Sequence, residues 1–309
     1  TGTPTVGGTF SVNIKIDDNN GGQAIQIFDI TVPFPPKTYV PDDNFEAYLE
    51  THDASGNTVS IGDPASMGDG IASNDSVLTL RISGVTSLDV NNQSIADLTG
   101  IEEFSALISL NCRSNQLAIL DLSNNTSLEN LYCSYNQLTT LDVTQNTALN
   151  EILVFNNQLT NLDVTQNTAL EELDCRVNQL QNLDLSSNTS LKYLHCHSNQ
   201  LTNLNFGNIS NLHYLDCQNN QLSILNLVNF HWTLASLICR NNQLTSLNLS
   251  INTQLRELDF SNNQLTSLDV RNGNNTNLIN FNASGNSNLN CISVDDATWA
   301  TANWTSSPF

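Results

Sequence analysis

The feature that most constrains this 309-residue sequence is an internal repeat with a period of about 21 residues. It is clearest in the cysteines, whose successive gaps are 21, 42, 21, 21 and 22 residues as far as Cys239. Ten consecutive repeats carry a small or apolar residue at this position: Val90, Cys112, Cys133, Val154, Cys175, Cys196, Cys217, Cys239, Phe260 and Ala283. A unit this short cannot bury its apolar residues alone, so the repeats must stack and share one continuous core.

Each unit contains a Leu-x-Cys segment, then Asn-Gln-Leu, and then a second Leu-Asp-Val or Leu-Asp-Leu segment before Asn-Thr. Side chains alternate between the two faces of a strand, so the Leu and Cys face inward and the residue between them faces outward. The pattern is that of a leucine-rich repeat. We therefore predict an α/β or mostly β solenoid of about ten repeats of 21–23 residues, capped at both ends. The return side of each repeat is the part that contains the second Leu-Asp segment and leads to the next Leu-x-Cys strand. This part can be extended rather than helical.

Two sets of asparagines recur at fixed places in the repeat. Their side-chain amides are expected to bond backbone groups at the turns, which would otherwise be buried without partners. The first set comprises Asn115, Asn136, Asn157, Asn178, Asn199, Asn220, Asn242, Asn263 and Asn286. The second set, at the opposite corner, comprises Asn125, Asn146, Asn167, Asn188, Asn252 and Asn275.

The remaining sequence is organised around the repeats. Residues 1–36 contain two β-patterned runs around DDNNGG, which predict a hairpin or the remnant of a preceding β domain, followed by a proline-rich linker. Residues 37–85 form the N-terminal cap, with a helix starting after Pro41 and the first strands within VLTLRISGVTSLDV. Residues 86–288 are the leucine-rich repeats. Residues 289–309 form the C-terminal cap, in which Trp299 and Trp304 shield the core.

Charge and hydropathy exclude several classes of partner. The chain has 9 Lys and Arg against 30 Asp and Glu, a formal net charge of −21 at pH 7. So few cations argue against nucleic acid and against an anionic membrane surface. No apolar run approaches the ~20 residues of a membrane helix, so we expect no membrane insertion. The sequence has no initiator Met or signal peptide, and we expect a processed piece of a longer protein.

The cysteines are interpreted as structural. Val154, Phe260 and Ala283 replace Cys at equivalent positions, which a metal ligand or a nucleophile would not allow. Neighbouring strands lie about 4.8 Å apart, which is longer than the Cβ separation of a disulfide, so the repeat thiols are expected to be free and buried. No nucleophile elbow, phosphate loop or zincin helix occurs. We therefore expect neither an enzyme nor a bound cofactor.

A column of carboxylates offers a possible exception for calcium. Asp121, Asp142, Asp163 and Asp184 occupy one repeat position in the second half-turn and face solvent in a row. Either each carboxylate bonds nearby backbone or Thr groups, or Ca²⁺ bridges the like charges. The His195-x-His197 spacing also suits a metal, but no third ligand is evident, so surface contact is the expected role.

The outward positions of repeats three to seven are rich in aromatic, Arg and His residues. Exposed aromatic side chains with such neighbours are typical of binding hot spots, and the chain contains only 6% aromatic residues. The candidate ligand-binding residues are Tyr132, Tyr135, Phe155, Arg176, Tyr193, His195, His197, Tyr214 and Asp216.

The repeat with Cys in its strand resembles the cysteine-ladder internalins. It is still more similar to the surface leucine-rich-repeat proteins common in gliding and marine Bacteroidetes, whose flanks resemble TYVPDDNFEAYLE and NLNCISVDDATWATANWT. This resemblance covers about residues 38–305 and implies a secreted or cell-surface binding protein, often with adhesin-like modules and a C-terminal sorting tail. In this group, the segment that follows the last repeat usually carries a second Cys soon after the first, and the resemblance therefore implies that Cys291 lacks its partner here.

These observations together predict an extracellular binding or adhesion module. Its ligand would be a protein or cell-surface group recognised by the outward face of the parallel sheet. One alternative is polysaccharide binding, because aromatic platforms with Asp, Asn and His neighbours also suit sugar rings. Another is a structural spacer that presents a different domain.

Overall fold

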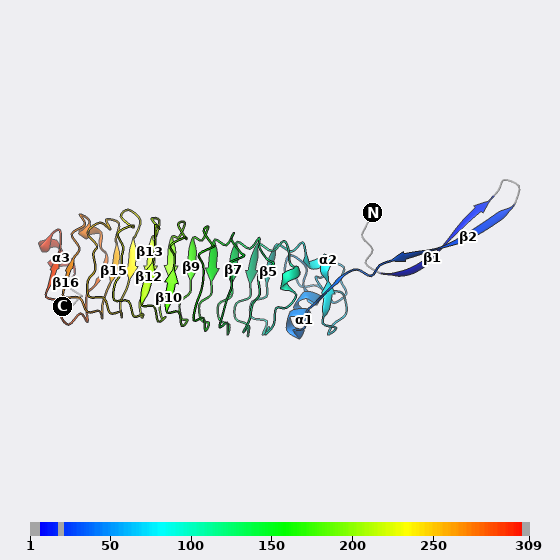
Figure 1. The fold of residues 1–309 in the computed structure, drawn as a ribbon, viewed down its shortest axis with the longest axis horizontal. Coiled ribbons are helices and arrows are strands. Elements are labelled where there is room, and N and C mark those ends of the chain that lie inside the picture. The colour runs from blue at the N-terminus through cyan, green and yellow to red at the C-terminus, as the bar shows by residue number, and fades with distance from the viewer. Residues whose placement is uncertain (1–6, 18–21, 305–309) are drawn as a thin grey trace.

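The computed structural model describes residues 7–17 and 22–304 and forms a long rod of stacked turns with a β-hairpin projecting from one end (Figure 1). Most of the regular structure is β-strand, and the turns follow one another along the rod in sequence order. The predicted mostly β solenoid is therefore confirmed.

Ten short parallel strands, one from each repeat, form a continuous sheet along the rod. Each strand pairs in register with the next, so that Leu194 lies beside Leu173 on one side and Leu215 on the other. The strands are β5 (Ser87–Asp89), β6 (Ser109–Asn111), β7 (Asn130–Tyr132), β8 (Glu151–Leu153), β9 (Glu172–Asp174), β11 (Tyr193–His195), β13 (Tyr214–Asp216), β14 (Ser236–Ile238), β15 (Glu257–Asp259) and β17 (Asn280–Asn282).

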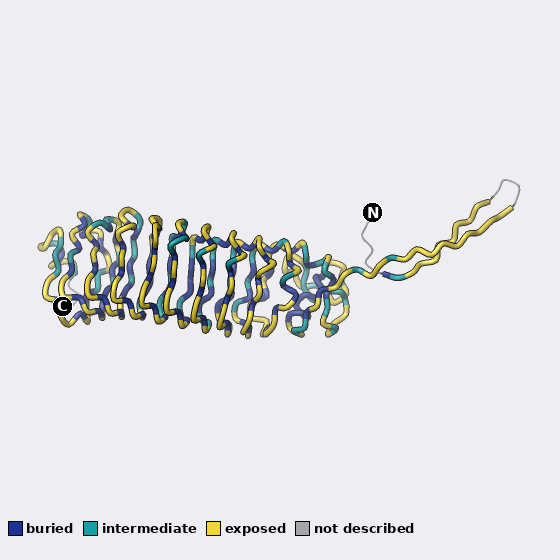
Figure 2. Tube along the Cα trace, viewed as in Figure 1, coloured by how far each residue is buried: buried dark blue, intermediate teal, exposed yellow. Residues whose placement is uncertain are grey.

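The core is a column of Leu and Cys layers inside the rod. Buried residues recur in successive turns along the rod (Figure 2). The middle residue of each sheet strand from β5 to β15 is buried, and so is the residue at every Cys position from Val90 to Ala283. The six repeat cysteines are buried free thiols, whereas Cys291 is a free thiol exposed to solvent. The inward assignment made from strand alternation is thus confirmed.

The first set of asparagines forms the predicted ladder beside the sheet. Nδ2 of Asn178 donates to the carbonyls of Cys175 and Val154, both at 3.1 Å, while its Oδ1 accepts from the backbone N–H of Leu159 at 3.0 Å. Equivalent bonds recur through the set as far as Asn286. One side chain thereby satisfies three buried backbone groups and joins two repeats.

The second set lies at the opposite corner and also bonds the previous repeat. Nδ2 of Asn146 donates to the carbonyls of Leu122 and Asn125, both at 2.9 Å. Asn275 departs from the pattern, because it bonds Val270 in its own repeat and accepts from the backbone of Asp295 at 2.7 Å. It therefore ties the array to the C-terminal cap.

The return side of the repeats is extended, as the second Leu-Asp segment indicated. Strand β10 (Asn182–Asp184) pairs in parallel with β12 (Asn203–Asn205), and β16 (Ser267–Asp269) pairs with β18 (Cys291–Ser293). Short 3₁₀ turns occur at Ile101–Glu103 and Asn275–Asn277. Over residues 7–17 and 22–304, no helix is long and apolar enough to span a membrane.

The N-terminal end of the rod is closed by helix α1 (Asp43–Thr51) and an antiparallel pair, β3 (Lys37–Tyr39) with β4 (Ser76–Leu78). Asp42 caps α1 by accepting from the backbone of Asn44 and Phe45 at 3.0 Å. The segment VLTLRISGVTSLDV contributes to two strands, β4 and β5, as predicted, and Thr79–Ile82 between them forms the short helix α2, which the sequence analysis did not predict. This turn carries the chain from the antiparallel pair to β5, with Ile82 buried beneath it.

The projecting hairpin consists of β1 (Gly8–Asp17) and β2 (Gln23–Val32), which are antiparallel, with Gly8 opposite Val32 and Asp17 opposite Gln23. Residues 18–21 of its DDNNGG segment lie outside the described residues. Phe10, Ile14 and Ile16 share one face of the hairpin and are exposed. Whether this hairpin is the remnant of a larger β domain stays a prediction.

The C-terminal end is covered by helix α3 (Ala297–Asn303) and by Trp304. The ring of Trp304 stacks on Phe281 of the last sheet strand, with the ring centres 4.0 Å apart. Trp299 meets Trp304 edge-on at 6.0 Å. Both tryptophans thus lie where their shielding role was predicted, while residues 305–309 lie outside the described residues.

Candidate binding face

The outward surface of the ten-stranded sheet, called the sheet face below, consists of three rows of side chains. The rows take the first, third and fifth residues counted from the start of each strand, which alternate with the buried Leu and Cys positions. For β11 these residues are Tyr193, His195 and His197. Because the strands are in register, equivalent side chains of neighbouring repeats stand side by side.

Tyr193 and Tyr214 form the aromatic centre of the sheet face. They occupy equivalent places on the paired strands β11 and β13, and Tyr193 is 44% exposed. The ring of His195 lies 4.7 Å from that of Tyr214, and the ring of His213 lies 6.3 Å from that of Tyr193. Burial is the main cause that raises the pKa of Tyr214 to about 12, so its hydroxyl stays protonated and can donate a hydrogen bond.

Asp216 lies beside this pair but is only 4% exposed. Its carboxylate accepts from Nε2 of Gln218 at 3.0 Å and lies 4.0 Å from Nε2 of His197. Burial lowers the pKa of both His195 and His197, and the negative charge of Asp216 opposes that shift. A ligand can therefore reach Tyr193 more easily than the carboxylate of Asp216, which contacts Gln218 and His197.

Phe155 is a correction to the expected set of exposed aromatic residues, since it is 4% exposed. It points outward, but neighbouring side chains cover it. The guanidinium carbons of Arg176 and Arg113 lie 4.3 and 5.2 Å from its ring centre, and the ring of Tyr135 meets it edge-on at 5.2 Å. Arg176 and Tyr135 remain accessible, so the surface here is presented by the residues that cover Phe155.

Acidic groups on the sheet face are partly buried. The hydroxyl of Tyr132 donates to Glu151 at 2.7 Å. Asp174 is 5% exposed, and burial raises the pKa of its carboxyl to about 6, although Arg176 counteracts that shift. Burial, and then the charge of Glu151, raise the pKa of Glu172. The raised pKa values of Asp174 and Glu172 mean that these two carboxyl groups ionise less readily than carboxyl groups in water.

The structure divides the predicted site residues into two neighbouring groups. Tyr193, His195, His197, Tyr214 and Asp216 meet on β11, β13 and the residues that follow them. Tyr135, Phe155 and Arg176 meet on the adjoining repeats. Tyr132 belongs to the same repeat as Tyr135, but its hydroxyl bonds Glu151. Asp174 links the groups, because it pairs in register with His195 and lies 3.5 Å from Nε of Arg176.

Three contributing residues were absent from the predicted set. Arg113 and Asp174 occupy outward positions that the repeat pattern identifies, but their contacts with Phe155 and Arg176 depend on which residues the adjacent repeats carry. His213 precedes β13 and stacks near Tyr193. The sequence feature that could have identified His213 is its position directly before Tyr214, a predicted site residue.

The carboxylates of the return-side column bond their own turns. Oδ1 of Asp142 accepts from the hydroxyl and the backbone N–H of Thr144 at 2.7 and 2.9 Å, and Asp163 does the same with Thr165. These bonds lower the pKa of Asp142. These bonds are the ones that the first of the two interpretations given above expects, and the calcium interpretation stays a prediction.

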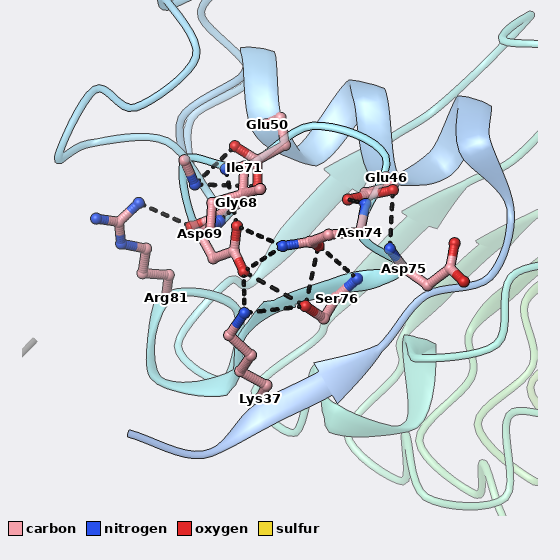
Figure 3. Close-up of polar contacts among 11 residues, drawn as sticks. Lys37, Glu46, Glu50, Gly68, Asp69, Ile71, Asn74, Asp75, Ser76 and Arg81 are labelled. Carbon is pink, nitrogen blue, oxygen red and sulfur yellow. Dashed lines mark hydrogen bonds and ion pairs between the residues drawn. The ribbon is translucent and has the colours of Figure 1, made fainter. Parts of the chain in front are cut away.

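The oxygen-rich segment GDGIASND, residues 68–75, contacts Lys37 through Asp69 (Figure 3). The ammonium of Lys37 lies 2.5 Å from Oδ2 of Asp69 and 3.2 Å from Oγ of Ser76. Glu50 accepts from the backbone N–H groups of Asp69 and Gly70. The polar groups of this loop therefore hold the N-terminal cap together.

One group of acidic side chains in the described residues comes close enough to share a cation. It comprises Asp43, Glu46 and Asp75, whose oxygens lie within 4.8 Å of one another. Glu46 is buried and accepts from the backbone N–H of Asn74 at 2.9 Å, whereas the other two are exposed. The aspartate column and the His195-x-His197 pair form no such group within residues 7–17 and 22–304.

Comparisons with known proteins place the array among leucine-rich-repeat proteins. No family model matches the sequence. The functional domain of InlJ from Listeria monocytogenes, which includes a cysteine ladder, aligns at 32% identity with a TM-score of 0.66 over 84% of this chain. This chain has a leucine-rich-repeat fold with a cysteine ladder. The alignment covers 62% of the InlJ domain, and the predicted resemblance to cysteine-ladder internalins is confirmed.

Other relatives agree over shorter stretches or at lower identity. Internalin J from L. monocytogenes serotype 4b strain F2365 is 46% identical over 52 residues, which are 17% of this chain and 6% of that protein. Internalin C2 from L. monocytogenes is 21% identical with a TM-score of 0.52, covering 83% of this chain and 97% of its own. YopM from Yersinia pestis is 24% identical with a TM-score of 0.52, covering 69% and 67%. These last two share the fold, while the resemblance to Bacteroidetes proteins stays a prediction.

Proposed function

We propose that this leucine-rich-repeat array is an extracellular binding module, secreted or displayed at a cell surface, that recognises a protein ligand through the sheet face. The observation that carries the proposal is the Tyr193–Tyr214 pair, which points away from the Leu column on two adjoining strands. Large aromatic side chains next to partly buried polar groups are the usual anchors of protein interfaces.

The rest of the sheet face supports the same use. Arg176 lies over a buried Phe155, and His195 lies against Tyr214, so several side chains are already ordered before a ligand arrives. Ordered side chains reduce the entropy that binding must overcome. The similarity to InlJ adds a relative of the same cysteine-ladder type.

Polysaccharide binding is the second candidate, and one observation favours it. The rings of Tyr193 and His213 lie 6.3 Å apart, with their planes inclined at 30°, beside the Tyr214 and Asp216 pair. Flat rings with neighbouring polar groups also suit sugar rings. A spacer function would require neither feature.

The test is a screen of the purified array against extracellular-protein and glycan arrays, repeated with the double variant Tyr193→Ser/Tyr214→Ser. We expect a protein ligand whose affinity falls by about tenfold or more in this variant. The matched control is Ile119→Ser/Ile224→Ser, which truncates two exposed side chains outside the sheet face and should bind as the parent does. A ligand found only among glycans would favour the second candidate, and full binding by the tyrosine variant would contradict both.

A further inference from the structure

Positive charge on the sheet face is concentrated in one row. Of the six arginines in the chain, Arg113, Arg176 and Arg240 occupy the fifth position counted from the start of their strands. The ten residues at this position, called the basic row below, are Asn91, Arg113, Ser134, Phe155, Arg176, His197, Gln218, Arg240, Ser261 and Ser284. None of them is Asp or Glu, although the chain contains 30 of these residues.

Phe155 holds two of these guanidinium groups in place. The Arg176 and Arg113 guanidinium carbons lie 4.3 and 5.2 Å from its ring centre, and the ring itself is 4% exposed. A guanidinium group stacked on an aromatic ring keeps its N–H groups available at its edge. The two cations are thereby fixed near one another although their strands are three repeats apart.

The donors of this cluster are largely unused. Within the described residues, the guanidinium group of Arg113 makes neither a hydrogen bond nor an ion pair with another side chain. Arg176 has one acidic neighbour, Asp174, at 3.5 Å from its Nε. Arginine pairs with carboxylates through two parallel N–H bonds, so both groups retain the capacity for such a partner.

We propose that Arg113 and Arg176, stacked on Phe155, bind carboxylate side chains of an acidic protein segment that lies along the basic row. This proposal rests on the proposed function, because it takes the sheet face as the binding face. The present proposal adds the chemical class of the ligand and names the basic row as the part of the sheet face that binds it. An acidic partner is unusual for a chain with a net charge of −21, so the local cluster must supply the attraction.

The spacing of the arginines fits an extended segment. The guanidinium carbons of Arg113 and Arg176 lie 5.2 and 4.3 Å from the same ring centre, so they are no more than about 9.5 Å apart. Residues two apart in an extended chain project from the same face about 7 Å apart, within that limit. Arg240 lies three strands beyond Arg176, about 14 Å, which is the distance between residues four apart on the same face. A segment with an acidic residue at every second position therefore presents carboxylates to all three arginines.

The probe for the test is a labelled peptide with Glu at every second position and Thr between, compared with the same peptide carrying Gln in place of Glu. Fluorescence anisotropy is measured at about 0.15 M salt, where charges more than about 8 Å apart are screened. We expect the Glu peptide to bind at least about tenfold more tightly than the Gln peptide. Equal binding of the two peptides, or no binding of the Glu peptide, would overturn the proposal.

The variant Arg113→Gln/Arg176→Gln should bind the Glu peptide at least about tenfold more weakly than the parent. Its matched control, Arg256→Gln/Arg271→Gln, removes the same charge elsewhere and should bind within about twofold of the parent. An equal loss of affinity in the two double variants would show that only the overall charge of the protein matters. It would overturn the assignment of the binding site to Arg113 and Arg176. If the Gln pair does not fold, Arg113→Lys/Arg176→Lys replaces it and should lose at least about threefold, because Lys lacks the planar fork.

Two further outcomes would reassign the ligand class. Polygalacturonate that binds more tightly than the peptide at equal carboxylate concentration would identify a sugar acid instead of a protein segment. Self-association that Arg113→Gln/Arg176→Gln abolishes would identify a second copy of this acidic chain. The proposed function is tested separately, because loss of the screened ligand in Tyr193→Ser/Tyr214→Ser does not depend on either arginine.

Discussion

The side-chain amide of Asn178 donates a hydrogen bond of 3.1 Å to the carbonyl oxygen of Val154, which lies 24 residues earlier in the chain. The same amide nitrogen bonds Cys175 in its own repeat. A single residue type therefore fixes the turn after the strand and joins consecutive repeats. Since the bond recurs along the rod, neighbouring repeats are coupled by hydrogen bonds as well as by the Leu column.

Replacing Asn178 with Ala should destabilise the array by about 2–3 kcal/mol, because buried backbone groups of Cys175, Val154 and Leu159 lose their partner. The free energy of unfolding in urea provides the measurement. Gln179→Ala, at the exposed neighbouring residue, is the control and should change it by less than about 0.5 kcal/mol. Equal effects of the two substitutions would contradict the ladder.

The thiols should fall into two classes of reactivity. Burial raises the pKa of the Cys112 thiol to about 12 and that of Cys133 well above its usual value, whereas Cys291 is exposed. Because the thiolate is the reactive form, we expect one fast-reacting thiol in the folded protein and six more after unfolding. Titration with a chromogenic disulfide at pH 8 measures both, and Cys291→Ser should remove the fast phase. Fewer than seven thiols in denaturant without reductant would mean that a disulfide exists.

Asp174 should make stability depend on pH in the direction opposite to an ordinary paired carboxylate. Burial raises the pKa of its folded-state carboxyl to about 6, compared with about 3.9 in an unfolded chain. The folded protein therefore binds the proton more tightly, and its stability falls as the pH rises from about 4 to 6. The Asp174→Asn variant lacks this carboxyl and therefore lacks this loss of stability. The free energy of unfolding of the variant minus that of the parent should therefore rise by about 2 kcal/mol between pH 4 and pH 7.

Urea unfolding at several pH values measures that difference. Asp142→Asn provides a control of opposite sign, because hydrogen bonds from Thr144 lower the pKa of Asp142. Its contribution is present above the unfolded pKa and is lost only as the pH falls through the lower folded value. A flat difference for Asp174→Asn between pH 4 and pH 7 would show that its carboxyl is not shifted as described.

Calcium should have no effect on stability through the aspartate column. Oδ1 of Asp142 and of Asp163 already accepts two hydrogen bonds from the following Thr. We therefore expect the same melting temperature in excess chelator and in millimolar calcium. A ligand that binds only the folded state would raise the melting temperature progressively as its concentration increases, and such a rise with calcium would restore the calcium interpretation.

The repeat pattern was sufficient to predict the fold because nearly every repeat carries Leu, a small or apolar residue and Asn at the same positions. The inward position of Leu194 follows from strand alternation, and the bonds of Asn178 follow from the recurrence of Asn at one turn. The end caps do not repeat, and there the sequence analysis missed the short helix at Thr79–Ile82, which lies between the predicted strands β4 and β5. Its conformation depends on the change from an antiparallel pair to the first parallel strand.

Exposure on the sheet face was harder to predict than direction. Phe155 and Asp216 both point outward as expected, yet each is 4% exposed. Their burial depends on long side chains from other repeats, such as Arg113 over Phe155 and His197 beside Asp216. Such contacts vary from repeat to repeat, so periodicity alone cannot supply them.

Hydroxyl-radical footprinting of the array with its screened protein ligand tests the central claim most directly, because it reports the exposure of individual side chains. Tyr193 and Tyr214 on the sheet face should be protected by the ligand. Tyr39 in the N-terminal cap and Trp232, which are 61% and 75% exposed, should react as in the free protein. Protection of Tyr39 or Trp232 with unchanged labelling of Tyr193 and Tyr214 would place the ligand elsewhere and contradict recognition by the sheet face.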